Sequence, residues 1–347
     1  MDDDQPTRRR ALQLAVVAAA ATAAGCSSSD PVARPAVRPS PFRTRPPTPR
    51  PLVASPAPAL APVARWAPSP RESVPGLKLA AADVVQALCT RRAGQGLADA
   101  LASVAPLLGP GFDQALALSV LAPLGEGLAS TGEIVYPQYG GLDPMATDAV
   151  RGAAMVVVRQ RVLSEAGLVS TTTRTLDVRL TRFGSQWLVT AVPEAGGEPV
   201  ARPAGLSPAA VRVLDNPQLV LPDTARWDIH AGLVSDDVLE VLSNAGTLGT
   251  VGVTVLRTGH PREVFGTPTV SAHAVGRAVD VWQIAGNAVV DDVGPGTLTT
   301  QLQTAAMIDP RVDQVGSPPG TDLDGPGSRR SFANLVHEDH LHLAVRQ

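Results

Sequence analysis

The chain has 347 residues, of which 44% are hydrophobic and 18% charged, and a formal net charge of −3. This charge excludes a chain built as a whole around nucleic-acid binding, which needs a strongly basic domain. At about 150 residues per domain the length allows roughly two domains. The 33 prolines and 31 glycines predict that part of the chain does not fold. Lys78 is the only lysine, which we interpret as a GC-rich coding bias.

Residues 1–25 are typical of an export signal. Arginines at 8–10 precede an apolar run at 11–24, which is shorter than the about 20 residues of a membrane span but suits a signal peptide. The small residues before Cys26 resemble a bacterial lipobox, and the arginines resemble a twin-arginine signal. The resemblance implies a lipid on Cys26 and an extracytoplasmic, membrane-anchored protein. Nothing in the sequence leads us to infer an obligate protein partner. An uncleaved N-terminal anchor is the alternative.

Residues 26–76 are predicted to form a disordered tether. Between residues 31 and 75 the chain has 14 prolines and 7 arginines, and few side chains there could bury apolar surface. A proline-rich segment favours an extended, semi-stiff spacer. We therefore expect this segment to hold a folded body away from a membrane.

Residues 77–203 are predicted to form an accessory α+β domain. Helical spacing of apolar residues is followed by alternating strand patterns, and the order resembles the cystatin-like, nuclear-transport-factor-2-like fold. We assign no chemistry to this domain, because it has no histidine and no cluster of catalytic residue types. The expected helices and strands are residues 79–89, 97–108, 153–163, 173–183 and 187–192.

The candidate chemistry lies in residues 204–347, because all six histidines follow residue 229. A catalytic zinc site uses three nitrogen or oxygen ligands and leaves one position open, and His273, Asp280 and His342 would supply such a set. The sequence after His340 predicts a strand, on which His340 and His342 point to the same face. Two histidines and a carboxylate also describe non-haem iron sites, but there the first histidine and the acid are generally two residues apart rather than seven.

Two motifs carry a family resemblance. Ser-x-His-x-x-Gly-x-Ala-x-Asp at 271–280 and His-x-Asp-His-x-His at 337–342 resemble the zinc D-alanyl-D-alanine carboxypeptidases and the penicillin-insensitive murein endopeptidases. The resemblance implies an α+β zinc peptidase domain with a small antiparallel sheet and a Zn²⁺ ion held by the three residues named above. It also implies a base shortly before the last ligand. We favour Asp339 as the base with His340 as its partner, and the reverse assignment stays open.

One departure from the family concerns the substrate. The family has Ser-Gly-Tyr-Arg on the preceding strand, whereas this chain has Thr-Gly-His-Pro at 258–261, with His260 in the tyrosine place. Arg257 or Arg262 could replace the missing arginine, and Ser271 is expected to be a supporting or substrate-facing hydroxyl. We expect hydrolysis of peptidoglycan stem peptides. The alternatives are a non-catalytic wall-binding or regulatory lipoprotein with a metal site, and a peptidase acting on other peptides.

Overall fold

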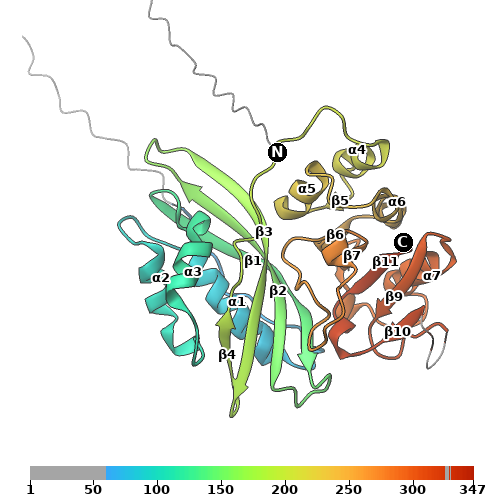
Figure 1. Cartoon of the computed structure of the whole chain (residues 1–347), viewed down its shortest axis with the longest axis horizontal. Coiled ribbons are helices and arrows are strands. Elements are labelled where there is room, and N and C mark those ends of the chain that lie inside the picture. Colours follow the sequence, from blue (N-terminus) through green and yellow to red (C-terminus); the bar gives the residue numbers. More distant parts are fainter. Residues whose placement is uncertain (1–59, 325–327, 329) are drawn as a thin grey trace, which may run out of the picture. The chain divides into compact units, whose positions relative to one another are not determined.

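The computed structural model describes residues 60–324, 328 and 330–347, and these described residues belong to one compact unit. The fold is α+β, as predicted, with two separate sheets (Figure 1). The predicted signal peptide, Cys26 and the first part of the predicted tether lie outside the described residues. Among the described helices, none is long and apolar enough to cross a membrane.

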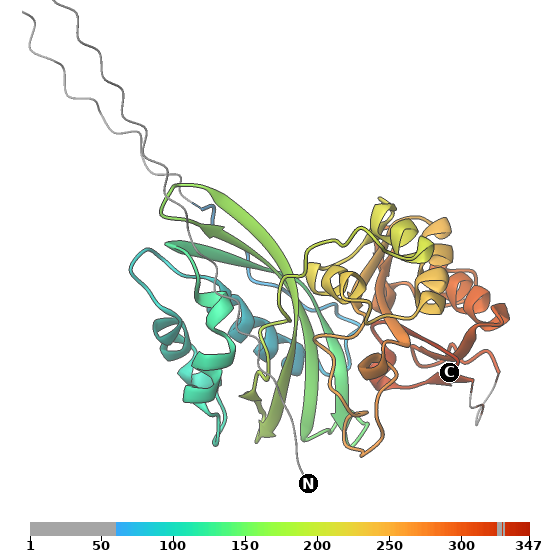
Figure 2. The same ribbon diagram turned by 45° about the horizontal axis from the view of Figure 1, so that its top comes forward.

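The first sheet is antiparallel and has the strand order β1-β2-β3-β4. Helix α1 packs against this sheet, and Figure 2 shows α1, α2 and α3 on one of its faces. Four of the five expected elements are present within four residues of their predicted bounds, whereas the segment predicted as one helix over 97–108 forms a shorter α-helix and a separate 3-10 turn. The elements are α1 (Pro75–Cys89), α2 (Leu97–Ser103), η1 (Ala105–Leu107), α3 (Gln114–Val120), η2 (Ala122–Gly125), β1 (Ala129–Asp143), β2 (Arg151–Leu163), β3 (Val169–Phe183) and β4 (Gln186–Ala191).

The sequence did not predict strand β1. Its glycines and Pro137 are residue types that weaken a strand pattern, and the strand accommodates irregularities by register shifts at Ile134/Tyr136 and at Tyr139/Gly141. Such bulges re-aim side chains locally. The result is that β1 directs polar side chains toward the second sheet, as described below.

The second sheet has the order β10-β9-β11-β7-β6-β5, with β8 paired to β7. The predicted small antiparallel sheet is therefore larger than expected and mixed, because the pairs β5–β6 and β9–β10 are parallel. Its elements are α4 (Pro208–Asp215), β5 (Leu219–Val220), α5 (Asp223–His230), α6 (Asp236–Ala245), η3 (Gly246–Leu248), β6 (Val251–Val255), η4 (His273–Val275), β7 (Ala278–Ile284), β8 (Asn287–Ala288), η5 (Val289–Asp291), α7 (Leu298–Ile308), β9 (Val312–Ser317), β10 (Ser331–Ala333), η6 (Leu335–His337) and β11 (Leu341–Val345).

Two adjacent strands of this sheet carry the second half of each sequence motif. Strands β7 and β11 pair antiparallel, and His342 lies directly opposite Asp280. Directly paired residues point to the same face of a sheet and lie close together. The short helix η4 is followed by Gly276, which has φ +68°. A Cβ there would lie 1.9 Å from the carbonyl oxygen of Leu233. Glycine is therefore required between His273 and Asp280 by this backbone contact.

The predicted disordered tether extends too far toward the C-terminus. Residues 60–76 pack on the folded body: Val74 and Glu72 are buried, and the backbone N–H of Ser73 donates to Glu338 at 2.7 Å. Arg65 also pairs with Asp83 of α1. Composition predicted disorder because the segment has few apolar residues, whereas polar contacts with distant parts of the chain hold these residues in place.

Candidate metal centre

Three predicted ligand atoms converge in the structure. Nε2 of His273 lies 3.0 Å from Oδ1 of Asp280 and 3.1 Å from Nδ1 of His342. The same oxygen and Nδ1 of His342 are 2.9 Å apart. Ligand atoms around a tetrahedral zinc ion at about 2.0–2.1 Å lie roughly 3.3–3.4 Å from one another. The three atoms could therefore hold such an ion if each moved apart from the others by a few tenths of an ångström.

Hydrogen bonding around His273 also favours a cation between these atoms. Its Nδ1 lies 2.8 Å from the carbonyl oxygen of Leu256, and because a carbonyl only accepts, Nδ1 carries the proton. In the neutral ring Nε2 then presents a lone pair to the Asp280 carboxylate and toward His342. Lone pairs facing one another in a buried site repel unless a proton or a metal ion lies among them. A metal-binding histidine typically donates its other ring N–H to a carbonyl or carboxylate, as His273 does to Leu256.

Asp280 is held ionised and oriented. Burial alone would raise the pKa of its carboxyl, but the imidazoles of His273 and His340 hold this pKa well below its usual range. Its second oxygen, Oδ2, accepts a hydrogen bond of 2.6 Å from Nε2 of Gln138 on β1. The carboxylate therefore directs Oδ1 toward the two histidines.

His340 lies beside the ligand atoms, whereas Asp339 lies behind it. Nε2 of His340 is 3.7 Å from Oδ2 of Asp280, and its Nδ1 is 2.7 Å from Oδ1 of Asp339. The carboxylate of Asp339 is fully buried, and its other oxygen contacts Nζ of Lys78 at 2.5 Å and the backbone N–H of Tyr139 at 3.0 Å. His340 and His342 thus both face Asp280, as the strand pattern predicted.

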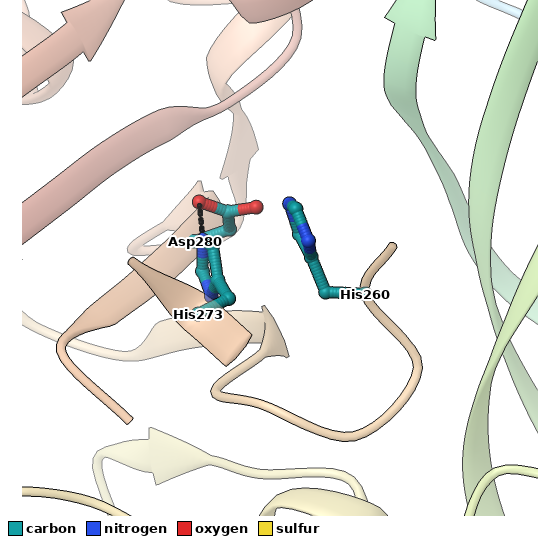
Figure 3. Close-up of side chains that lie close together, drawn as sticks. All are labelled: His260, His273 and Asp280. Atoms are coloured by element: carbon teal, nitrogen blue, oxygen red, sulfur yellow. Dashed lines mark hydrogen bonds and ion pairs between the residues drawn. The ribbon is translucent and has the colours of Figure 1, made fainter. Parts of the chain in front are cut away.

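His260 adds a fourth group that the sequence had placed only as a substitute for tyrosine. His260, His273 and Asp280 point toward one another (Figure 3), with ligand atoms within 4.8 Å. The ring of His260 stacks on that of His273 with centroids 4.2 Å apart, and burial lowers its pKa to about 3. His273 and Asp280 can therefore be combined with either His342 or His260 as the third ligand. The set with His342 is the tighter one, because its ligand atoms lie within 3.1 Å of one another.

A cavity of about 360 Å³ opens in front of these side chains and is lined from both sheets. Apolar residues make up much of its wall. Those from the first sheet and its β1–β2 turn are Leu142, Met145 and Met155, and those from the second sheet and its loops are Val264, Phe265, Val270 and Phe332. Phe265 packs directly on β1, where a Cβ at Gly141 would lie 2.2 Å from it. The two sheets therefore share this cavity.

The two arginines predicted to face the substrate do not line the cavity. Arg257 donates from Nε to the carbonyl oxygen of Ala274 at 3.1 Å, and the side chain of Arg262 is 80% exposed. The structure therefore does not bring either arginine to the cavity, because Arg257 is engaged by the carbonyl of Ala274 and Arg262 points to solvent. Arg277, inside the first motif, lines the cavity instead. Ser271 also lines it, and its Oγ accepts from the backbone N–H of His273 at 3.2 Å.

Sequence reasoning missed Lys78, Gln138 and Glu72, which lie in or next to the domain to which no chemistry was assigned. Lys78 is fully buried in α1 and contacts Glu72 at 2.7 Å. One sequence signal was available: a lone lysine on a helix whose neighbouring positions are apolar must find a buried partner. The partner itself, Asp339, is 261 positions away and could not be read from local pattern.

The carboxyl group of Glu72 makes a pH-dependent contribution to the free energy of unfolding. Burial raises the pKa of its carboxyl from 4.5 to about 7, which Lys78 opposes and Asp339 supports. The folded state therefore keeps a proton that the unfolded chain releases, so this stabilisation is complete below about pH 4.5 and is lost as the pH rises through about 7. In Glu72→Gln the free energy of unfolding should fall less between pH 5 and pH 8 than in the wild type.

Urea unfolding at four pH values across this range measures the difference. Glu165→Gln, in the exposed β2–β3 turn, is the control and should follow the wild type. Parallel curves for the wild type and Glu72→Gln would contradict a raised pKa at Glu72.

The sequence matches no protein-family model and no curated protein. The resemblance to zinc peptidases, which was drawn from the two motifs, and the resemblance of residues 77–203 to the nuclear-transport-factor-2-like fold therefore both stay predictions.

Proposed function

We propose that this protein is a zinc-dependent peptidase that hydrolyses peptidoglycan stem peptides outside the cytoplasm. One observation carries the proposal: Nε2 of His273, Oδ1 of Asp280 and Nδ1 of His342, from three separate segments, lie within 3.1 Å of one another. They adjoin a cavity large enough for part of a peptide. The substrate class follows from the motif resemblance and the predicted export signal.

His273, Asp280 and His342 would hold the ion. When bound, zinc would supply Lewis acidity, which lowers the pKa of a water molecule to about 7 and stabilises charge on a carbonyl oxygen. His340 is the group placed to move protons, since its Nε2 faces the cavity side of Asp280 while its Nδ1 is held by Asp339. It accepts the proton of the attacking water at Nε2 and returns it to the leaving amine.

This assignment reverses the roles favoured from the sequence. Asp339 is buried behind His340, and its oxygens are occupied by His340, Lys78 and the N–H of Tyr139. Burial would raise the pKa of Asp339, but the charge of Lys78 and the hydrogen bond with His340 lower it. An ionised carboxylate in this place stabilises the imidazolium that His340 becomes after it takes a proton.

The pairing of His340 with Asp339 also favours an enzyme over a wall-binding module that keeps a metal site. A purely structural zinc site uses four protein ligands and has no need for an oriented imidazole next to them. The apolar wall of the cavity, which both sheets build, would exclude water around a bound peptide.

The test is hydrolysis of a defined substrate panel by the chain from residue 27, with zinc and with a chelator. The panel holds monomeric pentapeptide muropeptides, cross-linked dimers and unrelated peptides of L-amino acids. We expect chelator-sensitive cleavage of a wall peptide. Zinc binding with no cleavage of any wall peptide would support the binding module, and cleavage of the unrelated peptides alone would move the proposal to another substrate class.

A further inference from the structure

We propose that the first sheet and α1 belong to the catalytic apparatus, with Gln138 and Lys78 as positioning residues for the metal centre and for His340. This inference rests on the proposed function for its kinetic consequence. Two of its consequences can be measured without any activity: the affinity of the protein for a metal ion and the tautomer of the His340 imidazole. Both residues lie in the segment that the sequence presented as an accessory domain.

Gln138 fixes the orientation of a candidate ligand. Its side chain is fully buried on β1, and its Nε2 donates to Oδ2 of Asp280 at 2.6 Å. Among the described residues its Oε1 has no hydrogen-bond partner, so the contact with Asp280 is the polar interaction that this amide makes. The bond stops the carboxylate from rotating and leaves Oδ1 facing His273 and His342.

Lys78 fixes the group that we propose as the proton carrier. Its Nζ lies 2.5 Å from Oδ2 of Asp339 and 4.7 and 4.4 Å from the ring centroids of Tyr136 and Tyr139. The other oxygen of Asp339 holds Nδ1 of His340. The chain of contacts from α1 therefore keeps the Nδ1–H tautomer of His340, whose Nε2 faces Oδ2 of Asp280 at 3.7 Å.

A contact that only holds the two sheets together would not need a buried lysine and a buried glutamine. Breaking a buried ion pair is strongly destabilising, but apolar side chains of similar volume often replace such a pair without loss. Here the only lysine of the chain and a buried glutamine both reach across to the second sheet, and both contact groups of the candidate metal centre. The arrangement matches partners that orient ligands, whose loss typically weakens metal affinity 10–100-fold.

The first experiment measures Co²⁺ and Zn²⁺ affinity and the Co²⁺ absorption spectrum of Gln138→Met. We expect metal affinity to fall by about 10–100-fold with an altered Co²⁺ spectrum. Gln160→Met is the matched control, since Gln160 is a buried glutamine on β2 whose Nε2 bonds to Cys89 and Leu124 carbonyls, and it should keep wild-type affinity. Wild-type affinity and spectrum in Gln138→Met would overturn its role.

The second experiment compares Lys78→Met, Lys78→Arg and the double variant Lys78→Met/His340→Ala in the full mature chain. We expect kcat to fall by about 10–100-fold in Lys78→Met with KM and zinc affinity nearly unchanged, and to recover in part in Lys78→Arg. Because Lys78 acts through His340, the double variant should be no slower than His340→Ala alone. Additive losses, or wild-type kcat in Lys78→Met, would overturn the role of Lys78.

Two readouts remain if the wild type cleaves no peptide or if Lys78→Met does not fold. The metal affinity of Gln138→Met does not depend on activity. The ¹⁵N chemical shifts of His340 report which ring nitrogen carries the proton, and we expect Nδ1–H in the wild type and Lys78→Arg. A wild type with Nε2–H on His340 would overturn this inference while leaving the proposed function to its own test.

Discussion

His342→Ala should abolish tight zinc binding. It removes one of the three atoms that converge within 3.1 Å, and the two ligands that remain cannot complete the set that a catalytic zinc needs. We expect the dissociation constant to rise by more than about 100-fold, beyond the range for loss of an outer partner. Competition titration with a chromophoric chelator measures this change, and peptide hydrolysis should be lost with it.

Two other histidines serve as controls for this variant. In His260→Ala the dissociation constant for zinc should stay within a few-fold of the wild type, because His260 is not one of the three residues whose ligand atoms lie within 3.1 Å of one another. His230→Ala, in α5, should change nothing, since its Nδ1 bonds to the carbonyl oxygen of Val200 and its side chain does not line the cavity. Retained binding in His342→Ala with loss in His260→Ala would identify His260 as the third ligand instead.

His340→Ala should lower kcat by about 10²–10⁴-fold, the usual contribution of a positioned general acid–base group, while zinc stays bound. Its Nε2 is 3.7 Å from the second oxygen of Asp280, so the variant removes the proton carrier and leaves the three ligand atoms in place. Steady-state kinetics with zinc content measured on the same samples separates the two effects.

Asp339→Asn and His337→Ala are compared with His340→Ala by their kcat. Asp339→Asn keeps the shape of the contact to His340 but removes its charge, so kcat should fall less than in His340→Ala. His337, whose Nδ1 lies 2.8 Å from Asn334, should give the smallest loss. An inactive Asp339→Asn beside an active His340→Ala would restore Asp339 as the base.

The local structure around the candidate ligands could be predicted from the sequence, whereas the strand pairing that brings His342 to Asp280 joins positions 62 residues apart. The spacing of His273 and Asp280 spans one turn and one strand, and the strand after His340 follows from its alternating pattern. Pairing of β7 with β11 then places His342 opposite Asp280. The motif does not show why its glycine is needed, whereas the structure places Gly276 against the carbonyl of Leu233.

The contribution of the first sheet could not be predicted, because it depends on contacts between residues far apart in the chain. Gln138 meets Asp280 across 142 positions, and nothing in the pattern of β1 indicates which way its bulged backbone points. The uniqueness of Lys78 was interpreted as coding bias, but its burial against Asp339 gives it a physical reason. Arg257 was misplaced because its backbone N–H donates to Asp228 of α5 and its guanidinium donates to the carbonyl oxygen of Ala274 in η4.

Anomalous X-ray diffraction at the zinc edge, from crystals of the zinc-loaded protein, tests the central claim most directly. We predict one strong peak in contact with Nε2 of His273, Oδ1 of Asp280 and Nδ1 of His342, with Nε2 of His340 nearby and unligated. A peak on other side chains, or no peak in protein that contains stoichiometric zinc, would contradict the claim that these three residues share one ion.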